Sequence, residues 1–170
     1  AGQKKVGVFV DEPITRILAT MEEYGLDALQ LHGRESAEQC YSLRTHGEVV
    51  KAFSIATAAD LEQTEHFEGS CDYYLFDTKG QRHGGNGFAF DWNVLNAYSG
   101  DTPFLLSGGI TPDDALKVRQ LLHSKLAGVD LNSRFETSAG VKSLSLLKQF
   151  ITPFIEAENQ QRITINPERI

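Results

Sequence analysis

The chain has 170 residues and a formal net charge of −7, with 41% hydrophobic and 23% charged residues. These proportions are typical of a globular protein with one sizeable core, so we expect a single domain. An acidic chain without a run of Lys or Arg disfavours a nucleic acid or an anionic membrane surface as partner, because phosphate groups bind through clustered cations. No apolar stretch has the length of a membrane span, so we expect no membrane partner.

Two cysteines, Cys40 and Cys71, are far apart in the chain. Neither belongs to a CxxC pair, and neither has histidines at the spacing that metal sites use, so we predict no metal site. Cysteines of this kind are typical of proteins in a reducing compartment. We therefore interpret both as reduced core residues of a cytoplasmic protein.

Short apolar runs, rich in β-branched and aromatic residues, alternate along the chain with segments of helical periodicity. We expect strands at residues 5–10, 28–31, 49–53, 73–76, 103–106 and 128–131. Helical spacing and helix-start signals predict helices at residues 14–24, 36–43, 57–66, 90–95, 111–122 and 143–155. Asp11 to Pro13 has the pattern of an N-cap and first turn for the first of these helices, and Gly25 ends it.

A β-α unit therefore recurs six times, at intervals of roughly 20 to 25 residues. Alternation of this kind predicts a parallel sheet whose strands are joined by right-handed crossovers. The sheet is either doubly wound or part of a (β/α) barrel, and the pattern alone leaves both architectures open.

The chain is organised around the stretch from Asp72 to Gly87, where an apolar strand is followed by a polar loop with four glycines. Asp77 stands at the end of that strand. Such strand ends lie at the mouth of a sheet or barrel, where active sites are usually built, so Asp77 is a candidate for chemistry. An aspartate that only caps the turn would give the same pattern. The glycines suit a mobile cover over a ligand.

Two neighbouring strand ends are suited to binding an anion. Ser107, Gly108 and Gly109 follow one strand, and the loop 132–142 follows the next. In (β/α) barrels a phosphate often binds between two such loops through backbone N–H groups, which glycine allows to come close. A tight turn without a ligand would also explain the two glycines. Asp130 either holds this loop in place or faces the site.

Polar side chains also close the second predicted strand. Gln30 and His32 stand at its end, so we expect both to line the mouth. A histidine that closes a turn through its own hydrogen bonds would give the same pattern. Farther along, Lys142 is interpreted as a surface charge rather than as a phosphate ligand.

Several short motifs occur in a fixed order: Gln30 to Gly33, Phe76 to Lys79, Gly84 to Gly87, Phe90 to Trp92, Leu106 to Ile110, Gly128 to Ser133, Glu136, and Gly140 to Lys142. Their order and spacing resemble the phosphoribosylanthranilate isomerase family, whose fold is a TIM (β/α)8 barrel. The resemblance extends from Lys4 to about Glu156. It implies about six β-α units of that barrel in one isomerase domain over residues 1–156, followed by a C-terminal tail over residues 157–170.

The resemblance implies an enzyme of tryptophan biosynthesis that catalyses an Amadori rearrangement without a cofactor. N-(5-phosphoribosyl)anthranilate becomes 1-(2-carboxyphenylamino)-1-deoxyribulose 5-phosphate. Asp77 matches the general acid of the family, and Gln30 and His32 are expected to line the anthranilate site. The phosphate of this small-molecule substrate is expected to be held, mainly through backbone donors, by Ser107, Gly108, Gly109, Asn132 and Ser133.

The resemblance does not extend to the first two β-α units of the family. The first family strand carries a Lys-x-Cys-Gly motif whose cysteine is the general base, and the second unit carries an arginine for the anthranilate carboxylate. Residues 1–10 resemble the third family strand, so we expect this chain to be incomplete for catalysis. Cys40 and Cys71 do not replace the base, because one lies within a predicted helix and the other at the start of a strand.

Two alternative functions stay open. Another phosphate-binding barrel, such as indole-3-glycerol-phosphate synthase, shares the phosphate loops, although the catalytic lysine and glutamate that it needs on early strands are not visible in this sequence. The second alternative is a non-catalytic barrel fragment that assembles with another chain. Exposed parallel strands at the edges of a barrel favour pairing, so we expect six such units alone to form a homo-oligomer through these edges, to borrow a segment from another chain or to aggregate.

Overall fold

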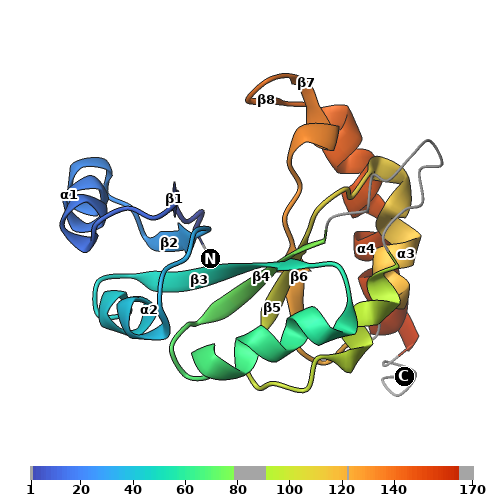
Figure 1. Ribbon diagram of the computed structural model, residues 1–170. Helices are drawn as coiled ribbons and strands as arrows, with labels where there is room; N and C mark the ends of the chain where they lie inside the picture. The colour runs from blue at the N-terminus through green and yellow to red at the C-terminus, as the bar shows by residue number, and fades with distance from the viewer. Residues whose placement is uncertain (1, 79–90, 122, 165–170) are drawn as a thin grey trace, which may run out of the picture. The chain divides into compact units, whose positions relative to one another are not determined.

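The structure, a computed structural model, describes residues 2–78, 91–121 and 123–164 (Figure 1). The chain divides into two compact units. The first comprises Ala1–Gly108 and His123–Asp130, and the second comprises Gly109–Leu122 and Leu131–Ile170. Each unit is described below by itself.

The first unit contains a six-stranded sheet in which every pair of neighbouring strands is parallel. The strands follow one another in chain order: β1 (Val6–Phe9), β2 (Ala28–Leu31), β3 (Glu48–Ile55), β4 (Tyr73–Thr78), β5 (Phe104–Ser107) and β6 (Leu126–Val129). A doubly wound sheet reverses its strand order at a switch point, whereas this sheet does not. The strand order therefore favours the barrel over the doubly wound alternative, and it confirms the six predicted strands.

In the described part of the first unit, four helical segments connect the strands: α1 (Ile14–Tyr24), α2 (Ala37–Leu43), and the 3-10 helices η1 (Ala58–Phe67) and η2 (Trp92–Ala97). Gly25 ends α1 in the left-handed conformation, with φ of 57°, as the sequence predicts. Ser36 caps α2 through its side chain, which accepts a hydrogen bond from Gln39 N.

The predicted N-cap role of Asp11 is wrong. Pro13 occupies the N-cap position of α1, and no side-chain hydrogen bond caps this helix. Asp11 instead lies two residues earlier with φ of 54°, and its carboxylate accepts hydrogen bonds from Arg34 N and Nε. The Asp11 carboxylate does not cap the helix because a tertiary contact occupies it, with the backbone of Arg34, 23 residues later in the chain.

The second unit contains the remaining elements: η3 (Pro112–Asp114), α3 (Ala115–Gln120), η4 (Ser133–Phe135), β7 (Glu136–Ser138), β8 (Val141–Lys142) and α4 (Leu144–Thr164). The segment predicted as a plain loop, 132–142, contains the antiparallel pair β7 and β8. Helix α4 continues to Thr164, beyond its predicted end at residue 155, because the following Glu, Ala and Gln residues favour helix.

An aromatic cluster fills the space between the sheet and the helices of the first unit. Tyr74 and Phe76 of β4 point to this side, and Phe76 packs on Phe104 of β5 with ring centroids 4.7 Å apart. Tyr98 follows η2 and packs edge-on against Phe76 and Phe104, at 5.2 and 5.5 Å. Because side chains alternate between the faces of a strand, this packing directs Asp77 to the opposite face.

Cys40 and Cys71 are both buried free thiols, as expected for core residues. The neighbouring Cys40 thiol together with burial raises the pKa of Cys71. Cys71 precedes β4, so it lies at the amino end of the sheet, away from Asp77. Among the described helices, none is long and apolar enough to span a membrane.

Candidate active site

The carboxyl ends of three strands in the first unit bring the main candidate residues to one edge of the sheet. In the register of the sheet, Asp77 of β4 is paired with Ser54 of β3 and with Ser107 of β5. Directly paired residues of neighbouring strands point to the same face. The structure therefore places the predicted acid beside the first residue of the predicted phosphate turn.

His32 and Gln30 lie at the same edge. The His32 ring Nε2 is 3.9 Å from Asp77 Oδ2, and the Gln30 Nε2 is 3.1 Å from the His32 Nδ1. An amide nitrogen only donates, so Nδ1 accepts this bond and the proton of the neutral imidazole lies on Nε2. The structure thus aims a ring N–H toward the Asp77 carboxylate, at a distance too long for a direct hydrogen bond.

A hydrogen bond between two strand ends fixes the Ser107 side chain. Its Oγ donates to Asp130 Oδ2 at 2.9 Å, and the backbone of Asp130 donates to Leu106 O at 2.8 Å. Of the two roles that the sequence left open for Asp130, this contact favours the one in which it holds the loop in place.

Thr78, which sequence reasoning missed, ties the end of β4 to the same turn. Its Oγ1 donates to Ser107 O at 2.8 Å and contacts Gly108 O at 3.3 Å. Gly108 has φ of 95°, and a Cβ at this position would lie 2.8 Å from Thr78 N and also meet Thr78 O. Only glycine satisfies both the backbone conformation and this close approach. The sequence feature that could have identified Thr78 is the position of its hydroxyl directly after the candidate acid, Asp77.

The other residues of the predicted phosphate site belong to the second unit. Gly109 has φ of 68°, and Ser133 begins η4. Asn132 Oδ1 accepts a hydrogen bond from Lys142 Nζ at 2.9 Å, and Lys142 also pairs with Glu136 at 2.8 Å. These contacts agree with the interpretation of Lys142 as a charge paired on the protein surface.

The Gly-rich loop that the sequence predicts to cover the site, including Lys79, lies outside the described residues. The structure describes the two positions that border it, Thr78 at the end of β4 and Asp91 at the N-cap of η2.

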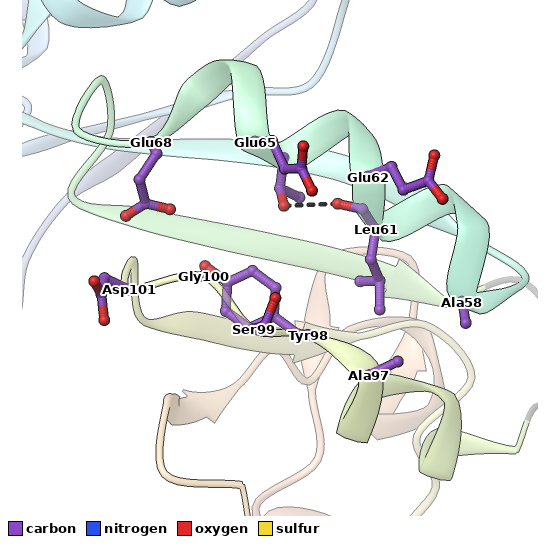
Figure 2. Close-up of a pocket in the computed structure, with 11 residues that line it drawn as sticks. Ala58, Leu61, Glu62, Glu65, Glu68, Ala97, Tyr98, Ser99, Gly100 and Asp101 are labelled. Atoms are coloured by element: carbon purple, nitrogen blue, oxygen red, sulfur yellow. Dashed lines mark hydrogen bonds between the residues drawn. The ribbon is translucent and has the colours of Figure 1, made fainter.

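A pocket of about 450 Å³ lies away from this edge, between η1 and the segment that follows η2 (Figure 2). None of the predicted site residues lines it. Its walls carry four carboxylates, and its eleven lining residues include no Lys or Arg: Ala58, Leu61, Glu62, Thr64, Glu65, Glu68, Ala97, Tyr98, Ser99, Gly100 and Asp101. The four negative charges disfavour a phosphorylated ligand.

A second pocket, of about 410 Å³, lies on the sheet face that carries Gln30 and Asp130. Apolar side chains from all six strands form most of its lining, which comprises Val6, Val8, Ala28, Gln30, Glu48, Val50, Tyr73, Leu75, Leu105, Ala127, Val129 and Asp130. The polar groups of the candidate site therefore border an apolar surface, as is typical of small-molecule sites.

The strands of this sheet are parallel and follow chain order, and polar groups gather at their carboxyl ends. This arrangement is typical of (β/α)-barrel enzymes, whose active sites lie at that edge. Comparison with known proteins is more specific. A family model described as N-(5'-phosphoribosyl)anthranilate (PRA) isomerase matches residues 1–153, and the chain belongs to this family.

Individual relatives agree with this membership. The N-(5'-phosphoribosyl)anthranilate isomerase of Parabacteroides distasonis is 50% identical over 149 residues, which cover 87% of this chain and 67% of that protein. The crystal structure of phosphoribosyl anthranilate isomerase from Thermotoga maritima superposes with a TM-score of 0.74 at 30% identity, covering 88% of this chain and 71% of that one.

A further solved phosphoribosyl anthranilate isomerase is in complex with reduced 1-(o-carboxyphenylamino)-1-deoxyribulose 5-phosphate. It superposes with a TM-score of 0.71 at 27% identity, and the match covers 88% of this chain and 70% of that one. The structural relatives confirm the TIM-barrel family to which the sequence pointed.

The close approach at Gly108 gives a stability prediction. Gly108→Ala is expected to lower the free energy of unfolding by about 2 to 4 kcal/mol, because left-handed strain and a backbone clash add. Gly69→Ala is the matched control: Gly69 has φ of 76° with nothing near its Cβ position, so only the strain of about 1 kcal/mol applies. Urea unfolding of both variants measures the difference, and equal losses would contradict the close packing at Gly108.

Proposed function

We propose that the site at the carboxyl ends of β2, β4 and β5 isomerises N-(5-phosphoribosyl)anthranilate in tryptophan biosynthesis. The observation that carries the proposal is the position of Asp77, between the His32 ring and the turn that begins at Ser107, in a chain of the isomerase family. The bound compound of the structural relative, a reduced form of the product, supports the same substrate class.

Asp77 is proposed as the general acid of the reaction. Protonation of the furanose ring oxygen breaks the C1–O bond and leaves an imine, and loss of the C2 proton then gives an enolamine that tautomerises to the ketone. Hydrogen moves within one molecule, so the chemistry is redox-neutral and needs no electron acceptor. A side chain at a strand end can give the proton directly to a substrate held in the mouth.

His32 and Gln30 are proposed to line the anthranilate part of the site. The Nε2–H of His32 points to the side of Asp77, where it is available to an anionic group of the substrate as well as to the carboxylate. Neither cysteine is in a position to act as the general base, because both are buried and Cys71 lies at the amino end of β4. The base therefore stays unassigned among the described residues.

The phosphate is proposed to bind through backbone donors of Ser107, Gly108 and Gly109, together with Asn132 and Ser133. The positive φ values of Gly108 and Gly109 support this proposal, because successive residues with such a turn conformation present their N–H groups on one side. The bond from Ser107 to Asp130 supports it further, since it orders the turn before a ligand arrives.

The two buried thiols, Cys40 and Cys71, support the proposed cytoplasmic location, because an oxidising compartment would favour a bond between neighbouring thiols. Fractionation of cells that express the tagged protein tests this location.

The acid role predicts a selective loss of turnover in Asp77→Asn. In an active preparation of the enzyme, kcat is expected to fall by a factor of about 100 to 10,000 while KM changes little, because the proton is needed mainly in the transition state. The fluorescence of phosphoribosylanthranilate follows its disappearance. Asp101→Asn is the control, since this exposed carboxylate lies in the acidic pocket. An unchanged kcat in Asp77→Asn would remove Asp77 from the mechanism.

The phosphate role predicts the opposite kinetic pattern for Ser107→Ala. Loss of the hydroxyl leaves the Asp130 carboxylate without this donor, and its charge then opposes the substrate phosphate, so KM is expected to rise about 10-fold with kcat nearly unchanged. Adding Asp130→Asn should restore much of the KM. If KM stayed at the wild-type value in Ser107→Ala, the phosphate assignment would be wrong.

Self-association through the edge of the sheet is also proposed. β1 is the terminal strand of the described sheet, and its Val6 and Val8 are 49% and 60% exposed. An exposed parallel edge with apolar side chains favours pairing with a second copy.

Sedimentation velocity tests the proposed pairing. The chain is expected to form dimers or larger species whose fraction rises with concentration, and Val8→Lys is expected to lower that fraction because it places a charge at the edge. Val141→Lys is the matched control, because Val141 is similarly exposed but lies in the β7–β8 hairpin. A monomer at all concentrations would refute the proposed edge pairing.

A further inference from the structure

A buried ion pair lies beneath the candidate site and takes no part in the proposed chemistry. Lys51 Nζ and Glu35 Oε2 are 3.3 Å apart, and the two residues are only 3% and 5% exposed. Removing two charges from water is costly, and apolar side chains of similar volume often stabilise a core as well as such a pair does. The presence of this ion pair is therefore better explained by the local geometry that it holds than by a gain in folding stability.

The Lys51 ammonium group is surrounded by backbone carbonyl groups from the end of β2, from the turn that follows it and from β3 itself. Nζ donates to Leu31 O at 3.2 Å, to Gly33 O at 2.8 Å and to Ala52 O at 3.1 Å. Together with the carboxylate, these oxygens give the ammonium group four acceptors for its three protons. Leu31 and Gly33 are the two neighbours of His32 in the chain, so Lys51 holds the backbone on both sides of it.

Glu35 holds the same turn through N–H groups. Its carboxylate accepts from Gly33 N at 2.9 Å and from Asp11 N, after β1, at 2.9 Å. A Cβ on Gly33 would lie 2.5 Å from Asp11 N and 2.8 Å from Glu35 Oε1, so the turn is packed without room for a side chain. The ion pair thus fixes both backbone groups of Gly33 and joins the segments that follow β1 and β2 to β3.

Lys51 itself faces away from the candidate acid. In the sheet register Lys51 is paired with Tyr74, whose ring lies in the aromatic cluster, whereas Asp77 belongs to the opposite face. Lys51 can therefore influence the site only through the turn that it holds. That turn carries the His32 ring, whose Nε2 lies 3.9 Å from Asp77 Oδ2.

We propose that Lys51 and Glu35 are positioning residues that hold His32 in register with Asp77. The inference rests on the proposed function, in which His32 lines the anthranilate site. Loss of either charge leaves the other charge buried without its counter-charge, which is costly, and the turn moves to reduce that cost. A displacement of about 1 Å in a positioned group can lower a catalytic rate by roughly 100-fold, so the pair affects the reaction without touching the substrate.

Lys51→Met tests the proposal, because methionine keeps the apolar stem and removes the ammonium group. We expect kcat/KM for phosphoribosylanthranilate to fall about 10- to 100-fold in an active preparation of the enzyme. In a His32→Asn background the same change is expected to cost less than about 3-fold, because the group that it positions is already absent. Equal losses in the two backgrounds would overturn the proposal and assign Lys51 a general structural role.

Arg44→Met is the matched control for the loss of an ion pair. Arg44 and Asp72 pair at 2.7 Å, and Asp72 accepts from Val49 N, so this pair also joins a turn to a strand, at the amino end of the sheet. Its loss is expected to leave kcat/KM within about 2-fold of the unaltered enzyme. Glu35→Gln is the second test variant, since it removes the other charge at nearly constant size and serves if Lys51→Met does not fold.

The ring ¹⁵N and ¹³C resonances of His32, assigned by comparison with His32→Asn, report its position without any assay of activity. They are expected to shift in Lys51→Met and Glu35→Gln and to stay in place in Arg44→Met. Unchanged resonances in a fully active isomerase would overturn the positioning role and leave the proposed function intact. Shifted resonances would support the positioning of His32, while the absence of isomerase activity from a preparation that supplies a general base would refute the proposed function.

Discussion

The hydrogen-bonded register of the parallel strands is the constraint on which the candidate site depends. It aligns Asp77 with Ser54 and Ser107 in one row across three strands. A slip of one residue in β4 would turn Asp77 into the helix layer and bring Phe76 to the mouth. The packing of Phe76 on Phe104 opposes that slip, so the apolar core on one face of the sheet determines which polar groups meet at its edge.

The sequence predicted the elements of the first unit well because their signals are local. Apolar runs gave the six strands, and Gly25 and Ser36 marked helix ends through their own conformation and hydrogen bonds. The order of the strands in the sheet could not be predicted in this way. A barrel and a doubly wound sheet share the same alternation of strands and helices, and only the order in which the six strands pair distinguishes them. The error at Asp11 has the same origin, because a contact with Arg34 cannot be inferred from the neighbours of Asp11 in the chain.

The candidate site shows the same limit. Asp77 and Ser107 could be predicted because a polar residue at the end of an apolar run is conspicuous in sequence. Lys51 could not be placed in this way, although a lysine inside the predicted strand 49–53 was a visible exception to its apolar character. Apart from Ala52 O, its partners lie 16 to 20 residues earlier, at the end of β2 and in the turn that follows, whose geometry depends on the pairing of β2 with β3. Long-range contacts of this kind need a structure.

The proposed phosphate ligands explain why backbone geometry matters so much in this chain. Ser107, Gly108, Gly109, Asn132 and Ser133 carry no positive charge, and the protein as a whole has a net charge of −7. In the proposed site long-range attraction would therefore contribute little to substrate binding, and fixed N–H dipoles would supply the interaction. Such dipoles act only when the turn is ordered beforehand, which the bonds from Thr78 to Ser107 O and from Ser107 to Asp130 provide. In the proposed site the Asp130 carboxylate would serve the neighbouring anion indirectly, because the hydrogen bond that it accepts from Ser107 Oγ orders the turn.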